Sequence, residues 1–253
     1  MTDPERLDLA RPRGTSELLN DAVRIYFANF GTVFAIAAAI VVPVQLIVSG
    51  IGLEELTSGY RAEANTAEIL IPTLVSFLVV VPLIAAATIG VLRDLGNGER
   101  PRFGRSLQLG LDAFAPVFLA VLLAGVGIAA GLLALIVPGI YIAVRWLFVP
   151  QAVVVENARG PSALRTSWAL TEGFWWRTFL VVVLANLIAF LPGLLIITPL
   201  QALAESADRQ WIALAGMILT ETLTAPFVAL VSTLLFFDLR TRRSTNPQQM
   251  SLE

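Results

Sequence analysis

The chain of 253 residues contains no cysteine, no histidine and no lysine. Without cysteine it has no disulfide and no thiol nucleophile, and without histidine it lacks the commonest general base and the usual ligand for zinc or haem. These absences exclude most familiar hydrolytic and metalloenzyme chemistry. The composition therefore indicates a protein that is not an enzyme and that uses no cofactor.

Charge is also scarce, since 14% of the residues are charged, 57% are hydrophobic and the mean hydropathy is +0.78. A soluble domain normally carries about a quarter charged residues. A helix that spans a membrane needs roughly 20 mostly apolar residues. Six runs have about this length or more, except that the fourth is shorter: 32–51, 69–92, 117–137, 140–155, 178–197 and 211–237. The sequence therefore predicts an all-α integral membrane protein with six transmembrane helices.

The two ends of the chain are polar and lack long apolar runs. Residues 1–14 mix both signs of charge and do not have the layout of a cleaved signal peptide. We therefore expect a disordered cytoplasmic tail at 1–14, a membrane domain at 15–243 and a second disordered cytoplasmic tail at 244–253.

The arginines are distributed unevenly between alternate loops. Fourteen of them lie before the first run, after the second and fourth runs, and after the sixth: Arg6, Arg11, Arg13, Arg24, Arg93, Arg100, Arg102, Arg105, Arg159, Arg165, Arg177, Arg240, Arg242 and Arg243. The other loops hold only Arg61 and Arg209, beside several acids. Because cytoplasmic loops retain positive charge, this pattern predicts a multi-pass protein of the cell membrane with both termini in the cytoplasm.

Three segments that precede the odd-numbered runs share a pattern. Each has an arginine, then a serine, then apolar residues at helical spacing, beginning at Arg13, Arg102 and Arg159. We expect three amphipathic helices at the membrane interface, with the serine hydroxyl as a candidate N-cap. The sequence thus predicts three pseudo-repeats, each an interfacial helix followed by a transmembrane hairpin.

Two ionisable residues fall inside apolar runs, where charge is costly and usually paired. Arg145 lies in the fourth run and Glu221 in the sixth, at depths within roughly one helical turn of each other. A buried Arg145–Glu221 pair is therefore a candidate intramembrane polar site. Such a pair either fixes the register of two helices or lines a path for a substrate or ion. Uncharged polar residues at similar depths are candidates for the same lining: Gln45, Ser76, Thr88, Asn186, Thr220, Thr222 and Thr224.

Two stretches resemble the membrane domain associated with glycerophosphoryl diester phosphodiesterases. They are the segments 136–177, which contains IVPGIY and ALRTSWALTEGFWWR, and 235–243, LFFDLRTRR. The positions that carry the resemblance are Pro138, Gly139, Arg145, Glu156, Ser167, Trp168, Asp238 and Arg240. The chain departs from the family at Ser244 and Thr245, where the family has Glu-Gly. It has no soluble phosphodiesterase domain, so the resemblance implies a stand-alone membrane domain without that activity.

Three functions remain open from the sequence. The first is a non-enzymatic module that organises membrane lipids or a membrane or cytoplasmic protein partner, with no role for nucleic acid. The second is a small transporter or channel with a polar site around Arg145 and Glu221. The third is an intramembrane enzyme using Glu156, Glu172 and Asp238 as metal ligands, although these carboxylates do not have a ligand spacing.

Overall fold

The computed structural model describes residues 7–48 and 66–245, and over these residues the regular structure is entirely helical. The elements are α1 (Thr15–Ala28), α2 (Phe30–Val48), α4 (Thr66–Val75), η1 (Ser76–Val80), α5 (Val81–Gly96), α6 (Phe103–Asp112), α7 (Phe114–Ala134), α8 (Ile136–Arg145), α9 (Val149–Glu156), α10 (Pro161–Thr171), α11 (Trp175–Ala207) and α12 (Gln210–Thr245). The element η1 is a short π-helix that continues α4 into α5.

Within residues 7–48 and 66–245, six helical segments are long and apolar enough to cross a membrane, as the sequence predicts. They are Phe30–Val48, Leu70–Gly96, Phe114–Ala134, Ile136–Glu156, Trp175–Ala207 and Gln210–Thr245. Several large apolar side chains at the α7–α8 turn and on α11 are exposed, including Leu133, Val137 and Leu195. Exposed apolar surface of this extent is typical of a protein that faces lipid.

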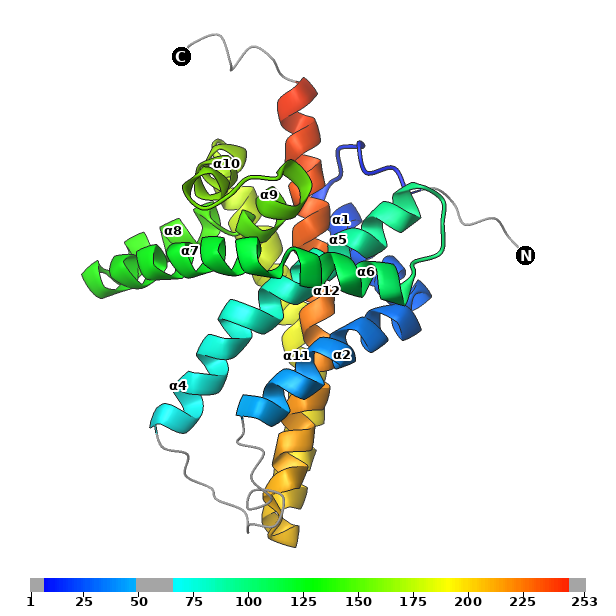
Figure 1. Cartoon of the computed structure of the whole chain (residues 1–253), viewed down its shortest axis with the longest axis vertical. Helices are drawn as coiled ribbons and strands as arrows, with labels where there is room; N and C mark the ends of the chain where they lie inside the picture. The colour runs from blue at the N-terminus through cyan, green and yellow to red at the C-terminus, as the bar shows by residue number, and fades with distance from the viewer. Residues whose placement is uncertain (1–6, 49–65, 246–253) are drawn as a thin grey trace.

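Helix α12 is the centre of the bundle (Figure 1). Leu230, Leu234 and Phe236 are fully buried in it, and α12 packs against α11, α2, α5 and α1. The α7–α8 hairpin crosses the α11–α12 hairpin at a steep angle (Figure 1). We call the end of the bundle formed by α1, α6, α10 and the last turns of α12 the arginine-rich end.

Residues 7–14 are not a free tail, which corrects the expectation for this segment. Arg13 is almost completely buried, and its backbone N–H donates to Asp238 on α12 at 2.6 Å. The N–H of Leu7 donates to the carbonyl of Leu95 on α5 at 3.2 Å. Polar composition misled the prediction because the segment is held by specific hydrogen bonds, by an ion pair and by the packing of Leu7 and Leu9 against the core. Residues 1–6 and 246–253 lie outside the described part, and α12 continues to Thr245.

Short helices precede α2, α7 and α11, as expected, but they begin without serine caps. The caps are Gly14, Arg102 and Gly160, none of which makes a side-chain capping bond. The serines lie inside the first turns, and Ser106 packs against Gly90 on α5, where a Cβ would lie 3.0 Å from the Ser106 Cα. The sequence pattern therefore located the helices but misassigned the residues that begin them.

Small residues bring α7 and α8 close together. A Cβ at Gly127 would lie 2.3 Å from the Trp146 indole, and one at Gly131 would lie 3.1 Å from the Gly139 Cα. The GxxxG spacing of Gly127 and Gly131 thus serves packing within the chain. This packing holds the Trp146 ring beside the end of α8, where the candidate site lies.

Candidate functional site

The fourth apolar segment is broken at the candidate residue Arg145. Helix α8 ends there, the chain turns through residues 146–148, and α9 begins with Pro150 in its first turn. Proline has no N–H, so it cannot donate to the carbonyl of Trp146 four residues earlier. The N–H of Val149 donates to this carbonyl instead, at 3.3 Å. The fourth apolar run, which is the shortest of the six, therefore forms two short helices in place of one straight helix.

Ser167 on α10 stabilises the break. Its hydroxyl accepts a hydrogen bond from the N–H of Phe148 at 3.1 Å and donates one to the carbonyl of Arg145 at 2.8 Å. Ser167 is fully buried, so water cannot reach the Phe148 N–H and the Arg145 carbonyl at this point, and the serine hydroxyl satisfies both groups instead. Ser167 thus positions the backbone at Arg145.

The guanidinium of Arg145 lies among aromatic side chains. Its Nε and Nη2 donate to the Tyr141 hydroxyl at 3.0 and 2.7 Å, and its Nη1 donates to the Trp168 carbonyl at 3.3 Å. The Arg145 Cζ lies 4.9 Å from the Trp168 ring centroid and 5.1 Å from that of Tyr141. Trp175 stacks on Tyr141, with ring centroids 5.7 Å apart. We call Tyr141, Arg145, Trp168 and Trp175 the Arg145 site.

The Arg145 site has a positive charge that no acid in the described part of the chain neutralises. A guanidinium carries five N–H donors, and the three bonds above leave two on the terminal nitrogens. Tyr141 and Trp168 are both partly exposed, so the site is open to a ligand. Its chemistry is that of an anion receptor with apolar, aromatic walls.

The predicted pair between Arg145 and Glu221 is not formed in the structure. The Glu221 carboxylate accepts a hydrogen bond from Gln45 on α2, and Gln45 also donates to the Ser76 hydroxyl in η1 at 3.2 Å. The prediction compared depths along straight, parallel helices. In the fold, the α7–α8 hairpin crosses the α11–α12 hairpin steeply (Figure 1). The chain breaks after Arg145, and this side chain bonds to Tyr141 and to the Trp168 carbonyl on α10.

The motif residue Asp238 lies in a different, closed cluster at the arginine-rich end. It is fully buried and accepts hydrogen bonds from the Arg13 N–H, from Arg177 Nη2 at 2.9 Å and from Arg242 Nε at 2.9 Å. Arg177 and Arg242 also donate to the Arg13 carbonyl, and Arg13 pairs with Asp21 at 2.9 Å. We call Arg13, Asp21, Arg177, Asp238 and Arg242 the Asp238 cluster. Its bonds tie the N-terminal segment to α11 and α12, which is a structural role.

The other predicted positions have separate surroundings. Glu156 lies 3.8 Å from Arg240, at the end of α9, in a partly exposed ion pair. Pro138 and Gly139 lie in the first turn of α8, where Gly139 contacts Leu132 and Gly131. Among the described residues no three acidic side chains gather as metal ligands would, and Asp238 is engaged with arginines.

Sequence reasoning missed Tyr141, Arg13 and Arg177. Tyr141 precedes Arg145 by four residues, so the two share a helix face, and this spacing was a usable signal. Arg13 and Arg177 lie more than 60 residues from Asp238 along the chain, and no local pattern joins them to it.

One family model matches the chain, over residues 103–239, and it is described as Domain of unknown function (DUF7847). The match includes the whole Arg145 site, but of the Asp238 cluster it includes only Arg177 and Asp238. Neither the curated proteins nor the solved structures contain a significant match.

Proposed function

The chain belongs to the DUF7847 family of unknown function, and from its own residues we propose that it is a non-enzymatic membrane module that binds a phospholipid headgroup at the Arg145 site. The observation that carries this proposal is the partly exposed guanidinium of Arg145. It has no carboxylate partner in the part of the chain that the structure describes, and two of its N–H donors are left for an anion. Hydrogen bonds to a charged phosphate contribute about 1.5–3 kcal/mol each when they are shielded from water.

The proposal includes an orientation in the cell membrane. The six apolar segments cross the bilayer, and the arginine-rich end with both termini faces the cytoplasm, as the arginine distribution favours. Trp168, Trp175 and Trp176 then lie at the cytoplasmic interface, the level at which lipid phosphates occur. Arg165, which is exposed on α10 three residues before Trp168, adds a second cation near the same lipid headgroups.

We further propose that the chain consists of three pseudo-repeats. Each of α1, α6 and α10 is followed by a pair of apolar segments, which is the order that three duplicated units would produce. The resemblance to the membrane domain associated with glycerophosphoryl diester phosphodiesterases agrees with a role at lipid headgroups. In this proposal the chain organises lipid for a membrane or cytoplasmic partner protein rather than hydrolysing it.

Native mass spectrometry of the full chain in lipid nanodiscs tests the headgroup site. We expect the chain to retain about one phosphatidylglycerol, and Arg145→Gln to reduce its affinity about tenfold, since one charge-assisted contact is worth roughly 1.4 kcal/mol or more. Arg145→Lys should give an intermediate affinity, because an ammonium cannot form the fork that a guanidinium forms.

The matched control is Arg24→Gln, because Arg24 is an exposed arginine on α1 at the same end of the bundle. Competition by inorganic phosphate separates a lipid site from a site for free phosphate. Equal retention in Arg145→Gln and Arg24→Gln, or a chain that loses all lipid and keeps its fold, would refute the proposal.

A second candidate function is transport of a proton or cation, and one observation favours it. Glu221 is a carboxylate within an apolar helix, and its hydrogen-bond partner Gln45 is neutral and also bonds to Ser76 in the π-helix η1. π-helical turns are frequent at functional sites. Flux into proteoliposomes that is lost in Glu221→Gln but kept in Thr222→Val would support transport. Equal flux in both variants and in empty vesicles would exclude it.

A further inference from the structure

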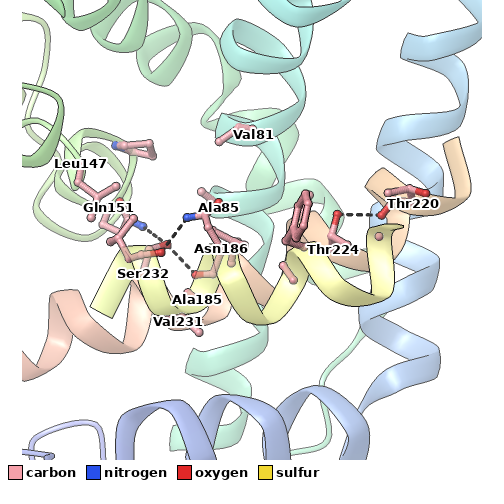
Figure 2. A pocket seen from close by; sticks show the side chains of 18 of the residues that line it. Val81, Ala85, Leu147, Gln151, Ala185, Asn186, Thr220, Thr224, Val231 and Ser232 are labelled. Carbon is pink, nitrogen blue, oxygen red and sulfur yellow. Dashed lines mark hydrogen bonds between the residues drawn. The ribbon is translucent and has the colours of Figure 1, made fainter. Parts of the chain in front are cut away.

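A cavity of about 580 Å³ lies between α5, α9, α11 and α12 (Figure 2). None of the residues given for its lining belongs to the Arg145 site or to the Asp238 cluster. This volume is in the range of small-molecule sites. Its walls are mostly apolar, with Val81, Ala189 and Phe190 among them, and every described residue that lines it is uncharged.

The length of the cavity suits one lipid chain. Thr220 and Ser232 both line it, and they are twelve residues apart on α12. At a rise of about 1.5 Å per residue this separation is roughly 18 Å. One leaflet of a bilayer has a hydrocarbon depth of about 15 Å, so an extended aliphatic chain matches the cavity.

One end of the cavity has a buried amide that is incompletely bonded. Gln151 is 1% exposed, its Nε2 lies 3.4 Å from the hydroxyls of Ser232 and Thr233, and its Oε1 has no hydrogen-bond partner. Buried polar atoms without a partner are rare and costly. If the amide were rotated by 180°, the nitrogen would be the unpaired atom. A hydroxyl group, which both donates and accepts, satisfies either orientation.

A second amide lies near this end. Figure 2 shows Asn186 of α11 turned toward Gln151 and Ser232. Asn186 is exposed, and its Nδ2 donates back to the Val182 carbonyl at 2.8 Å. It follows Trp175 by eleven residues, which is about 16 Å along an apolar helix. At that depth an exposed amide faces lipid rather than water, so a polar ligand that bonds to it would stabilise it.

We propose that this cavity binds a single-chain lipid with a neutral hydroxyl head, such as a long-chain alcohol. The hydroxyl bonds to Gln151, with Ser232 and Asn186 beside it, and the chain lies along α12 toward Thr220. A charged headgroup is disfavoured because the described residues that line the cavity include no charged side chain to pair with it. This site is independent of the Arg145 site and takes a different ligand.

Binding of radiolabelled hexadecanol to the full chain in detergent tests the polar end. We expect Gln151→Leu to weaken hexadecanol binding about fivefold, which is the usual effect of one lost hydrogen bond. The methyl ether of hexadecanol cannot donate a hydrogen bond. Its affinity should therefore differ less than twofold between the unmodified chain and Gln151→Leu. Equal affinities of the alcohol and the ether in the unmodified chain would overturn the assignment of the hydroxyl.

A pair of phenylalanine variants on α11 tests the apolar part. Ala189 lines the cavity and is nearly buried, whereas Leu187 lies outside it and is 56% exposed. Ala189→Phe should reduce hexadecanol binding more than tenfold, and Leu187→Phe should leave it unchanged. The same binding in both variants would show that the alcohol merely partitions into detergent and would overturn the proposal. Arg145→Gln should not change hexadecanol binding, which separates this site from the headgroup site.

Discussion

Asp238 is a single buried carboxylate that accepts hydrogen bonds from two segments distant in sequence and from Arg242 on its own helix. Breaking a buried ion pair by removing one partner is strongly destabilising, because the other charge remains desolvated. Arg177 and Arg242 are 20% and 31% exposed, so water partly compensates them. The contribution of Asp238 to stability should therefore be smaller than that of a completely buried pair.

We predict that Asp238→Asn lowers the free energy of unfolding by about 2–4 kcal/mol. Thermal unfolding of the full chain in detergent, followed by circular dichroism, measures the change. The control is Glu17→Gln, which removes the acid of an exposed pair with Arg11 and should cost under about 1 kcal/mol. If the two variants unfold at the same temperature, the Asp238 cluster does not hold the N-terminal segment.

Tyr26 gives a prediction for alkaline pH. Burial raises the pKa of the Tyr26 hydroxyl from 10.0 to about 12, and the hydroxyl donates to the Leu223 carbonyl at 2.9 Å. The folded chain therefore keeps its proton at a pH where the unfolded chain has lost it. By linkage, this stabilisation is complete below pH 10 and is lost as the pH rises from about 10 to 12.

The unfolding temperature of the unmodified chain should accordingly fall between pH 10 and pH 12, by an amount that corresponds to a free energy on the order of 2 kcal/mol. Tyr26→Phe should be less stable at pH 8 and should show a smaller fall over the same interval. An identical fall in both proteins would assign the pH dependence to groups other than Tyr26.

At the scale of elements, the contact between α7 and α8 depends on a missing side chain. A Cβ at Gly127 would lie 2.3 Å and 2.6 Å from two carbons of the Trp146 indole. Gly104 on α6 has nothing within 4 Å of its Cβ position and gives a matched helical control. The first position has no room for a methyl group, and the second does.

We predict that Gly127→Ala costs about 1–3 kcal/mol through overpacking and shifts the tryptophan fluorescence as Trp146 moves. Gly104→Ala should be neutral or slightly stabilising, because alanine has the higher helix propensity. Both are measured by thermal unfolding together with emission spectra. A Gly127→Ala chain as stable as the control would show that the α7–α8 contact can open without cost.

At the scale of the whole molecule, the property to measure is the orientation of the chain across the membrane. Because the chain has no cysteine, a single introduced cysteine can be labelled specifically. Ser206 and Ser244 are exposed serines near opposite ends of the α11–α12 hairpin. We predict that a membrane-impermeant maleimide labels Ser206→Cys in intact cells, and labels Ser244→Cys only after the membrane is opened. Labelling with the opposite preference would invert the proposed topology, and equal labelling would contradict the spanning arrangement of α11 and α12.

The number of apolar helices and the three short helices before α2, α7 and α11 were predictable from the sequence. Run length and helical spacing are local properties, and a bilayer-sized apolar run has few alternatives to a helix. The arginine distribution is likewise a property of the sequence alone, and it still provides the argument for orientation.

Only the tertiary structure decided which polar residues meet. Arg145 was identified from the sequence, but its surroundings depend on the break at Pro150 and on Ser167 from another helix. Glu221 accepts a hydrogen bond from Gln45, which also donates to Ser76, and it does not meet Arg145. Helices that cross steeply do not bring together residues that lie equally far from the ends of their helices. Pairing between distant segments depends on crossing angles and on where small residues allow close approach, and neither follows from periodicity along one helix.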